Sequence, residues 1–347
     1  MFNQRLSSVF LRSATPGRRL GGLLALTLAW GLLEPIFSPP AQACFFWQAC
    51  AQRRGRASNT RAGGKRTGRI RGGNDASIPY VITPRNAWIR QPNVETAYPI
   101  RWNPVEGAQS YTVRLWSWTY ERDQKDFALW ETTVDGDTTE IDFPRLLLEP
   151  GTYYSIEVVT DDGVSSDVDE GFFSSGFQLL YEEGYEILRS QIAAVTPAVA
   201  TGPVSGEPSE DASLALAGAY FLEEMYADSL RILRRLADRP EVSELVYSAL
   251  GDTYSAMGLN QLAIVAYDQG LALAQENFNV ESEAAIHASL ADVYATLGQL
   301  ESSLTQLQLA KRAYQELRAQ TEVARLERRI DVISARITQN VQESPLP

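Results

Sequence analysis

Apolar residues recur with two different periods along the chain. From residue 78 to about residue 175, apolar and polar side chains alternate in short runs, and turn residues separate the runs. A period of two residues is that of a strand with one buried face. Beyond residue 177, apolar residues recur every three or four positions, which is the spacing of one helix face. The pattern therefore predicts a β region followed by a helical region.

Seven short strands are expected in the β region. The alternation is clearest at residues 110–115, where Tyr111, Val113 and Leu115 share one face of a strand. Thr112 and Arg114 share the opposite face. The expected strands are residues 87–90, 97–102, 110–118, 129–134, 138–143, 152–160 and 167–173. So many short strands in about a hundred residues predict a β-sandwich.

Two segments make residues 78–175 resemble a fibronectin type III domain. Residues 100–104 read Ile-Arg-Trp-Asn-Pro, which looks like the second strand of that family with Trp102 in the core. Residues 148–158 look like the approach to its sixth strand. The resemblance implies that Tyr154 is a corner tyrosine, whose hydroxyl bonds to nearby backbone. The long aromatic segment 116–127 departs from the family pattern.

One motif occurs three times in the helical region. Each copy has a leucine, a small residue and a tyrosine, then a turn residue, a second small residue and a larger one. The copies are Leu216, Ala217, Tyr220, Glu224, Ser229 and Leu233; Leu250, Gly251, Tyr254, Gly258, Ala263 and Tyr267; and Leu290, Ala291, Tyr294, Gly298, Ser303 and Leu307. Successive copies are offset by 34 and 40 residues. Small residues let two helices approach closely, and large ones fill the gaps between pairs.

These copies resemble tetratricopeptide (TPR) repeats, whose unit is about 34 residues long. Glu224 replaces the turn glycine and Ala291 the first-helix glycine, and a longer connection at 272–281 accounts for the second offset. The resemblance covers residues 210–317 and implies an α-solenoid, in which the first helices line a groove for a protein or peptide partner. The implied groove residues are Ser248, Asp252, Ser255, Ala288, Asp292 and Ala295.

The two aspartates affect the expected ligand. TPR domains that grip a peptide C-terminus carry Lys and Asn at such positions, whereas this chain has Asp252 and Asp292. A basic ligand is therefore the hypothesis. The alternative is that both aspartates are solvated charges on the helix surface.

A single apolar stripe follows the repeats. Val323, Leu326, Ile330, Ile333 and Ile337 are spaced by three or four residues, with charged residues between them. Such a stripe belongs to one face of a long helix. It is interpreted as a cap over the last repeat at residues 318–340, and a coiled-coil dimerisation helix is the alternative.

The N-terminus has the pattern of an export signal over residues 1–43. Basic residues precede an apolar run from Leu20 to Leu33, and Ala41-Gln42-Ala43 fits signal peptidase. The 14-residue run is too short for a hydrocarbon core of about 30 Å. The expected location is therefore the periplasm, the cell surface or the medium. Cys44, the next residue, is a candidate for lipidation or for a disulfide with Cys50.

Charge is distributed unevenly along the rest of the chain. Residues 44–75 hold eight basic side chains and one acidic one, whereas residues 76–347 have a net charge of −22. Residues 44–77, rich in Arg, Gly and Ser, are expected to be a disordered basic linker. Its functional interpretation is attraction to an anionic envelope polymer or membrane surface, and the alternative is a soluble tether. Nucleic acid is not an expected partner of an exported chain.

Catalytic and metal-binding patterns are not recognised. The single histidine, His287, lies on a first helix without a second histidine nearby, and is interpreted as a packed or surface residue. Asp135-Gly136-Asp137 and the acidic segment 161–170 are interpreted as turn chemistry. A calcium site in these loops is the alternative. We expect no enzyme activity and no cofactor.

The expected organisation has seven parts. They are an export signal (1–43), a basic linker (44–77), a fibronectin type III-like β-sandwich (78–175), a connector (176–209), three TPR-like repeats (210–317), a capping helix (318–340) and a tail (341–347). The function expected from this organisation is that of an exported scaffold that binds a protein partner. The alternative is an adhesion or polymer-binding protein that uses the β-sandwich and the basic linker.

Overall fold

The computed structural model describes residues 72–91, 98–118, 125–144, 148–169, 176–195 and 208–343. The chain divides into residues 1–40 and 41–347, and every described residue belongs to the second unit. The predicted export signal, both cysteines and residues 44–71 of the predicted linker lie outside the described residues. Within the described ranges, no helix is long and apolar enough to cross a membrane.

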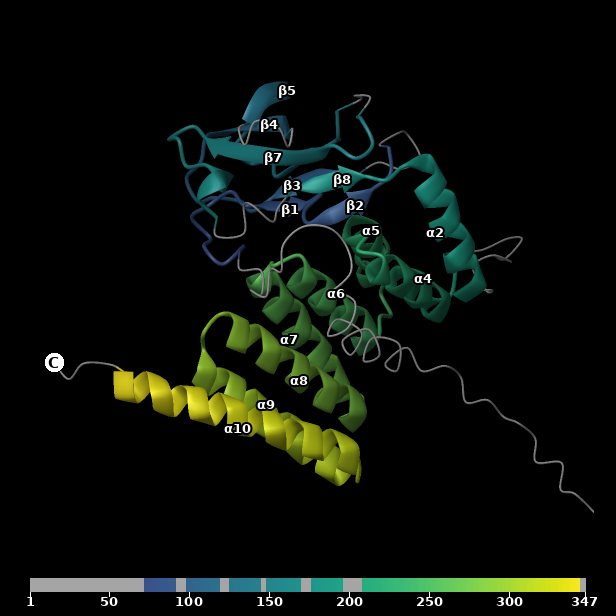
Figure 1. Cartoon of the computed structure of the whole chain (residues 1–347), viewed down its shortest axis with the longest axis vertical. Coiled ribbons are helices and arrows are strands. Elements are labelled where there is room, and N and C mark those ends of the chain that lie inside the picture. Colours follow the sequence, from purple (N-terminus) through teal and green to yellow (C-terminus); the bar gives the residue numbers. More distant parts are fainter. Residues whose placement is uncertain are drawn as a thin grey trace, which may run out of the picture. The chain divides into compact units, whose positions relative to one another are not determined.

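Two sheets make up the β region (Figure 1). The three-stranded sheet has the order β1-β3-β6, formed by Val81–Thr83, Ile100–Trp102 and Glu140–Ile141. The five-stranded sheet has the order β2-β8-β7-β4-β5, formed by Ala87–Ile89, Phe177–Leu179, Tyr153–Thr160, Ser110–Trp118 and Lys125–Asp135. Strand neighbours are antiparallel except β2 and β8, which are parallel.

Both sheets contribute to one apolar core, as the alternation of the sequence predicts. Trp102 of β3 is 1% exposed, and its ring centroid lies 5.5 Å from that of Tyr111 in an edge-on arrangement. Tyr154 of β7 is also buried, and its hydroxyl accepts a hydrogen bond from the Glu149 backbone N–H at 2.7 Å. The predicted burial of these two aromatic residues is therefore confirmed, as is the tyrosine-to-backbone bond. The fibronectin type III assignment stays a prediction.

The strands differ from the predicted ones at both ends of the region. β1 was not predicted, and no strand begins at residue 167. A 3₁₀ helix at Ser166–Val168 stands there instead, because the Ser165 hydroxyl accepts a bond from the Asp167 N–H. The last strand is β8, and residues 170–175 lie outside the described ranges.

Eight helices are described. They are α2 (Glu182–Val195), α4 (Glu210–Leu222), α5 (Tyr226–Ala237), α6 (Glu244–Ala256), α7 (Asn260–Glu276), α8 (Val280–Thr296), α9 (Leu300–Glu316) and α10 (Gln320–Glu343). From α4 to α9 they form three helix–turn–helix pairs that follow one another in chain order (Figure 1). The three predicted turn residues, Glu224, Gly258 and Gly298, all have a left-handed backbone, with φ of 62°, 77° and 79°.

The predicted close approach of paired helices is found at Gly251. A Cβ atom built there would lie 2.5 Å from the ring of Tyr267 on the neighbouring helix α7. In the other two pairs an alanine and a leucine stand at these positions, Ala217 with Leu233 and Ala291 with Leu307. The smallest first-helix residue thus faces the largest second-helix residue, so the space between the helices is filled in each pair.

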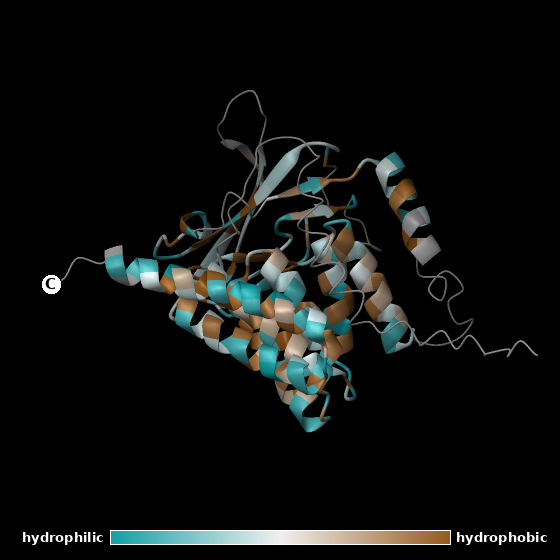
Figure 2. Cartoon of the chain, turned by 60° about the horizontal axis from the view of Figure 1, so that its bottom comes forward, coloured by the Kyte–Doolittle hydropathy of each residue, from teal (hydrophilic) through white to brown (hydrophobic). Residues whose placement is uncertain are grey.

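Helix α10 packs its apolar stripe on α9. Val323, Leu326 and Ile333 are buried in one cluster with Leu307 and Tyr314 of α9. Figure 2 shows hydrophilic residues along much of α10, the helix that leads to the marked C-terminus. The stripe is therefore buried within this chain, which is the arrangement expected of a cap.

A buried polar junction joins the β region to the repeats. Arg85, which follows β1, is 1% exposed. Its guanidinium pairs with Asp169 at 2.9 Å and donates to two backbone carbonyls, Val81 at 3.1 Å and Met257 at 3.0 Å. Met257 lies in the turn between α6 and α7, so one side chain bonds to both regions. Tyr80 adds an apolar contact, because it belongs to the core cluster of the helices.

Candidate functional site

The predicted groove residues lie at matching positions of two first helices. Ser248, Asp252 and Ser255 lie on α6, and all three are half-buried. On α8, Ala288 is buried, Asp292 is exposed and Ala295 is half-buried. The structure therefore leaves a mostly small and polar surface on these helices.

Both aspartates of this surface are held by neighbours. The Tyr267 hydroxyl on α7 donates to the Asp252 carboxylate at 2.6 Å. Asp292 forms an ion pair of 2.8 Å with Arg329 of α10, and the same guanidinium donates to the Ala288 carbonyl at 3.2 Å. A cation from the capping helix thus lies beside the predicted groove positions of α8. Because Arg329 pairs with Asp292, the surface is less acidic than the sequence indicates.

Arg329 is the residue of this surface that the sequence analysis missed. It lies between the apolar positions of the predicted capping stripe, where charged residues are usually solvated. Its contact with Asp292 spans 37 positions of the chain, and nothing in the local pattern indicates such a pair.

The single histidine is part of helix packing. His287 is buried on α8, and its Nδ1 lies 2.6 Å from the Gln306 side-chain oxygen on α9. Its Nε2 lies 3.7 Å from a Glu283 carboxylate oxygen one turn earlier on α8. These contacts place it between the two helices of the third pair, in agreement with a packed residue.

The acidic loops of the β region are engaged in local structure. The Asp161 carboxylate accepts backbone N–H bonds from Gln109 at 2.7 Å and Ser110 at 3.3 Å. Both bonds lower the pKa of Asp161, and the bond from Gln109 has the larger effect. Asp169 forms its ion pair with Arg85, and Gly136 lies in the turn after β5. In the described ranges no group of three His, Cys, Asp or Glu residues is placed to hold a metal ion.

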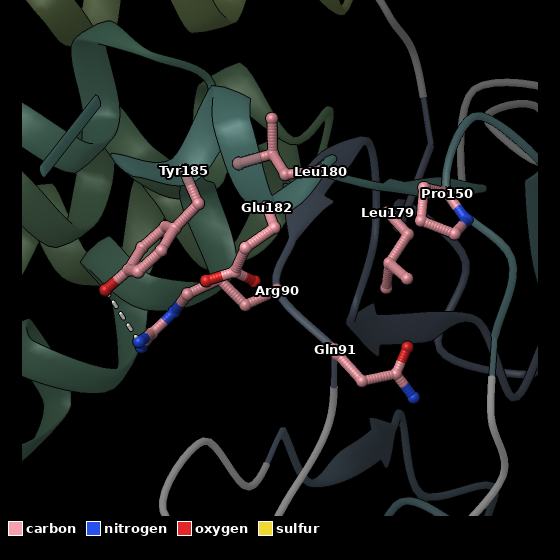
Figure 3. Close-up of a pocket in the computed structure, with 7 residues that line it drawn as sticks. All are labelled: Arg90, Gln91, Pro150, Leu179, Leu180, Glu182 and Tyr185. Carbon is pink, nitrogen blue, oxygen red and sulfur yellow. Dashed lines mark hydrogen bonds between the residues drawn. The ribbon is translucent and has the colours of Figure 1, made fainter. Parts of the chain in front are cut away.

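A second candidate is a small pocket at the end of β2 and β8 (Figure 3). Its volume is about 230 Å³, below the roughly 300–1,000 Å³ of pockets that hold small-molecule ligands. The lining residues are Arg90, Gln91, Pro150, Leu179, Leu180, Glu182 and Tyr185. The pocket is thus of a size for a single side chain rather than for a cofactor.

The Arg90 guanidinium of this pocket is already engaged. Arg90 donates to the Tyr185 hydroxyl at 2.8 Å, as Figure 3 shows, and to the Asp228 carboxylate at 3.2 Å. Asp228 is fully buried on α5 and also accepts the Tyr98 hydroxyl at 2.8 Å. Burial, with the charge of Asp228, raises the pKa of Tyr98 and raises the pKa of Tyr220 to about 12. Both phenols therefore stay protonated at neutral pH, and this network ties β2, α2 and α5 together.

The helix pairs and their spacing make the chain a helical-repeat protein. No protein-family model and no curated protein matches the sequence. Among solved structures, the chain is similar to BtubC from P. vanneervenii, at 21% identity over 42% of this chain and with a TM-score of 0.36. The similarity spans 65% of BtubC, which is less than two thirds of its length.

Chains with TPR-like repeats are also among the similar structures. One, from Podosopora anserina, is described as a kinesin light chain with nearly identical TPR-like repeats. It is 20% identical over 47% of this chain and 89% of its own, with a TM-score of 0.28. A second crystal structure of these repeats covers 46% and 88%, also with a TM-score of 0.28. Such TM-scores are too low to establish a shared fold, so the helix pairs of this chain are themselves the evidence for the repeats.

Proposed function

We propose that the chain is a non-enzymatic scaffold that binds a segment of a partner protein on the first-helix surface of its repeats. The observation that carries this proposal is the row of small or polar side chains on α6 and α8, formed by Ser248, Asp252, Ser255 and Ala295. The large apolar residues of the same helices are buried between the pairs. A surface of this kind leaves room for the backbone of a bound partner segment to approach the helices.

The preferred ligand is a basic segment. Asp252 places an acidic group in this row between Ser248 and Ser255, and its carboxylate accepts the Tyr267 hydroxyl at 2.6 Å. Asp292 contributes less, because Arg329 neutralises it. Complementary charge mainly increases the rate of association, so binding is expected to weaken as salt screens it.

The test is the selection of ligands from a phage-displayed library of random peptides, with the chain from residue 44 onward as the target. Enriched peptides are expected to be basic, and their affinity is expected to fall at high salt. Ser248→Arg with Ser255→Arg would fill the row with positive charge, and is expected to weaken binding by at least about tenfold. The matched control is Gln269→Arg on an exposed position of the second helix α7.

Equal affinity of the double variant and the wild type would remove this surface from consideration. Unchanged circular dichroism is required of both variants, because Ser248 and Ser255 are half-buried. A selection that enriches acidic peptides would contradict the charge argument while leaving the surface in place.

We also propose that the chain is exported and that its basic segment, residues 53–71, is attracted to an anionic envelope polymer or membrane surface. The support lies in the sequence, namely the apolar run, the Ala-x-Ala site and the cluster of arginines. Mass spectrometry of the mature protein is expected to find Cys44 as the first residue. An intact Met1 on cytosolic protein would contradict export.

A further inference from the structure

Phe278 is the most exposed of the large apolar side chains that the structure describes, at 89%. It lies in the turn between α7 and α8, where two asparagines flank it. A single exposed apolar residue needs no explanation by itself. Phe278 is also unusual in its backbone, which has a φ of +56°.

A left-handed backbone is costly for a phenylalanine. The same turn position between α9 and α10 holds Arg318, also with φ of +56°, so the turn geometry requires this conformation. Glycine or asparagine adopts it with less strain than a bulky residue. Asn277 and Asn279 stand on either side, yet phenylalanine occupies the strained position. Neither turn geometry nor core packing accounts for this choice of residue.

The turn is firmly anchored to α6. The buried Glu244 carboxylate accepts the Asn279 side-chain amide at 2.7 Å, the Ser282 hydroxyl at 3.2 Å and the Asn277 amide at 3.4 Å. The side-chain oxygen of Asn279 also accepts the Ser282 N–H at 3.1 Å and caps α8. The phenyl ring therefore projects from a turn that is fixed on both sides.

Exposed acidic side chains flank this turn along the chain. Glu276 ends α7 and Glu281 lies in the first turn of α8, and both are exposed. Glu241, before α6, is exposed on the same edge, because α6 begins where Glu244 meets the α7–α8 turn. The next turn along the edge presents Leu317, which is 43% exposed, and the exposed Arg318. Around the α7–α8 turn, the edge thus combines an exposed aromatic ring on an anchored backbone with a rim of three carboxylates.

We propose that Phe278 and its acidic rim form a docking site for a partner protein that presents an apolar pocket bordered by lysine or arginine side chains. Burying an aromatic ring in such a pocket is the usual form of an interface hot spot. The negative rim disfavours an anionic membrane as the occupant. A second copy of the chain docking by its small pocket is also disfavoured, because the Arg90 guanidinium of that pocket already bonds to Asp228 and Tyr185, and Glu182 adds a carboxylate there.

The test is photo-crosslinking in cells that produce the full chain, with benzoylphenylalanine at position 278. The matched control carries the same group at Val265, which is 55% exposed on α7. A discrete protein adduct is expected from position 278 and not from position 265. The crosslinked partner peptide should hold Lys or Arg beside apolar residues. Glu276→Lys with Glu281→Lys should lower the adduct yield by about tenfold, because like charges then meet.

Several results would overturn the proposal. These are the absence of an adduct, equal adducts from both positions, an adduct with a second copy or with lipid alone, and a yield that charge reversal leaves unchanged. Phe278→Gly provides an independent measurement. If the ring serves a partner and not the fold, the thermal unfolding midpoint of this variant is expected to equal or exceed that of the wild type, because glycine relieves the strain of the left-handed backbone. A fall of several degrees would assign Phe278 a structural role instead.

Discussion

At the scale of single residues, the contact of Gly251 with Tyr267 controls the approach of α6 and α7. A methyl group at Gly251 would lie 2.5 Å from the tyrosine ring, so the helices or the ring must move. We expect Gly251→Ala to cost about 1–3 kcal/mol of unfolding free energy, the range for overpacked cores. Adding Tyr267→Leu recreates the alanine–leucine combination of the other pairs and is expected to restore part of this loss. Chemical denaturation of the wild type, the two single variants and the double variant measures the coupling energy between Gly251 and Tyr267.

Strain at Glu224 leads to the opposite expectation. This residue holds the left-handed turn position that glycine occupies in the other two pairs, with φ of 62°. Its carbonyl accepts the Trp88 N–H at 3.2 Å, and a backbone bond of this kind survives a change of side chain. We therefore expect Glu224→Gly to raise the unfolding free energy by about 0.4–1 kcal/mol. Gly258→Ala, at the aligned position, should lower the unfolding free energy. If both variants change the unfolding free energy in the same direction, backbone strain at this turn position is not the explanation.

At the scale of elements, α10 is held by its apolar stripe rather than by its charges. Leu326 is 1% exposed against α9, whereas Val332 on the same helix is 60% exposed. We expect Leu326→Ala to lower the unfolding free energy by about 2–5 kcal/mol. Val332→Ala should change it by less than about 0.5 kcal/mol. Similar values for the two variants in thermal or chemical unfolding would show that the stripe does not attach the helix.

Local patterns predicted these elements well, and distant contacts were not predictable. The turn residues Gly258 and Gly298, the buried Trp102 and the stripe of α10 follow from spacing and residue type, which are properties of short segments. The pairing of Asp292 with Arg329 depends on how α10 lies beside α8, which no short segment encodes. This ion pair altered the candidate site most, because it neutralised one of the two aspartates expected to attract the ligand.

At the scale of the whole molecule, the β region and the repeats share buried contacts. Arg85 bonds to Asp169 in one region and to the Met257 carbonyl in the other, 172 positions away along the chain. A sequence interpretation in terms of separate domains could not include such a junction. The physical consequence is that the repeats are not expected to unfold independently of the sheets.

Replacement of Arg85 tests this coupling. Arg85→Met leaves the Asp169 carboxylate buried without its cation, which is expected to cost about 3–5 kcal/mol. Arg114→Met, which breaks exposed pairs on the outer face of β4, is expected to cost less than about 1 kcal/mol. Calorimetry of the wild type should show one transition. Two well-separated transitions in the wild type would mean that the junction does not couple the regions.

The register of α10 has a consequence for how this array could change in length. Helices α8 and α10 begin at Val280 and Gln320, which are 40 residues apart, the same interval that separates the second and third copies of the motif. Helix α10 therefore stands where the first helix of another unit would stand. A tandem duplication of residues 280–319 would insert a complete pair and leave both the terminal helix and the Arg85 junction in place. Gene duplication could thus lengthen the array at this end, whereas the opposite end is closed by the sheets.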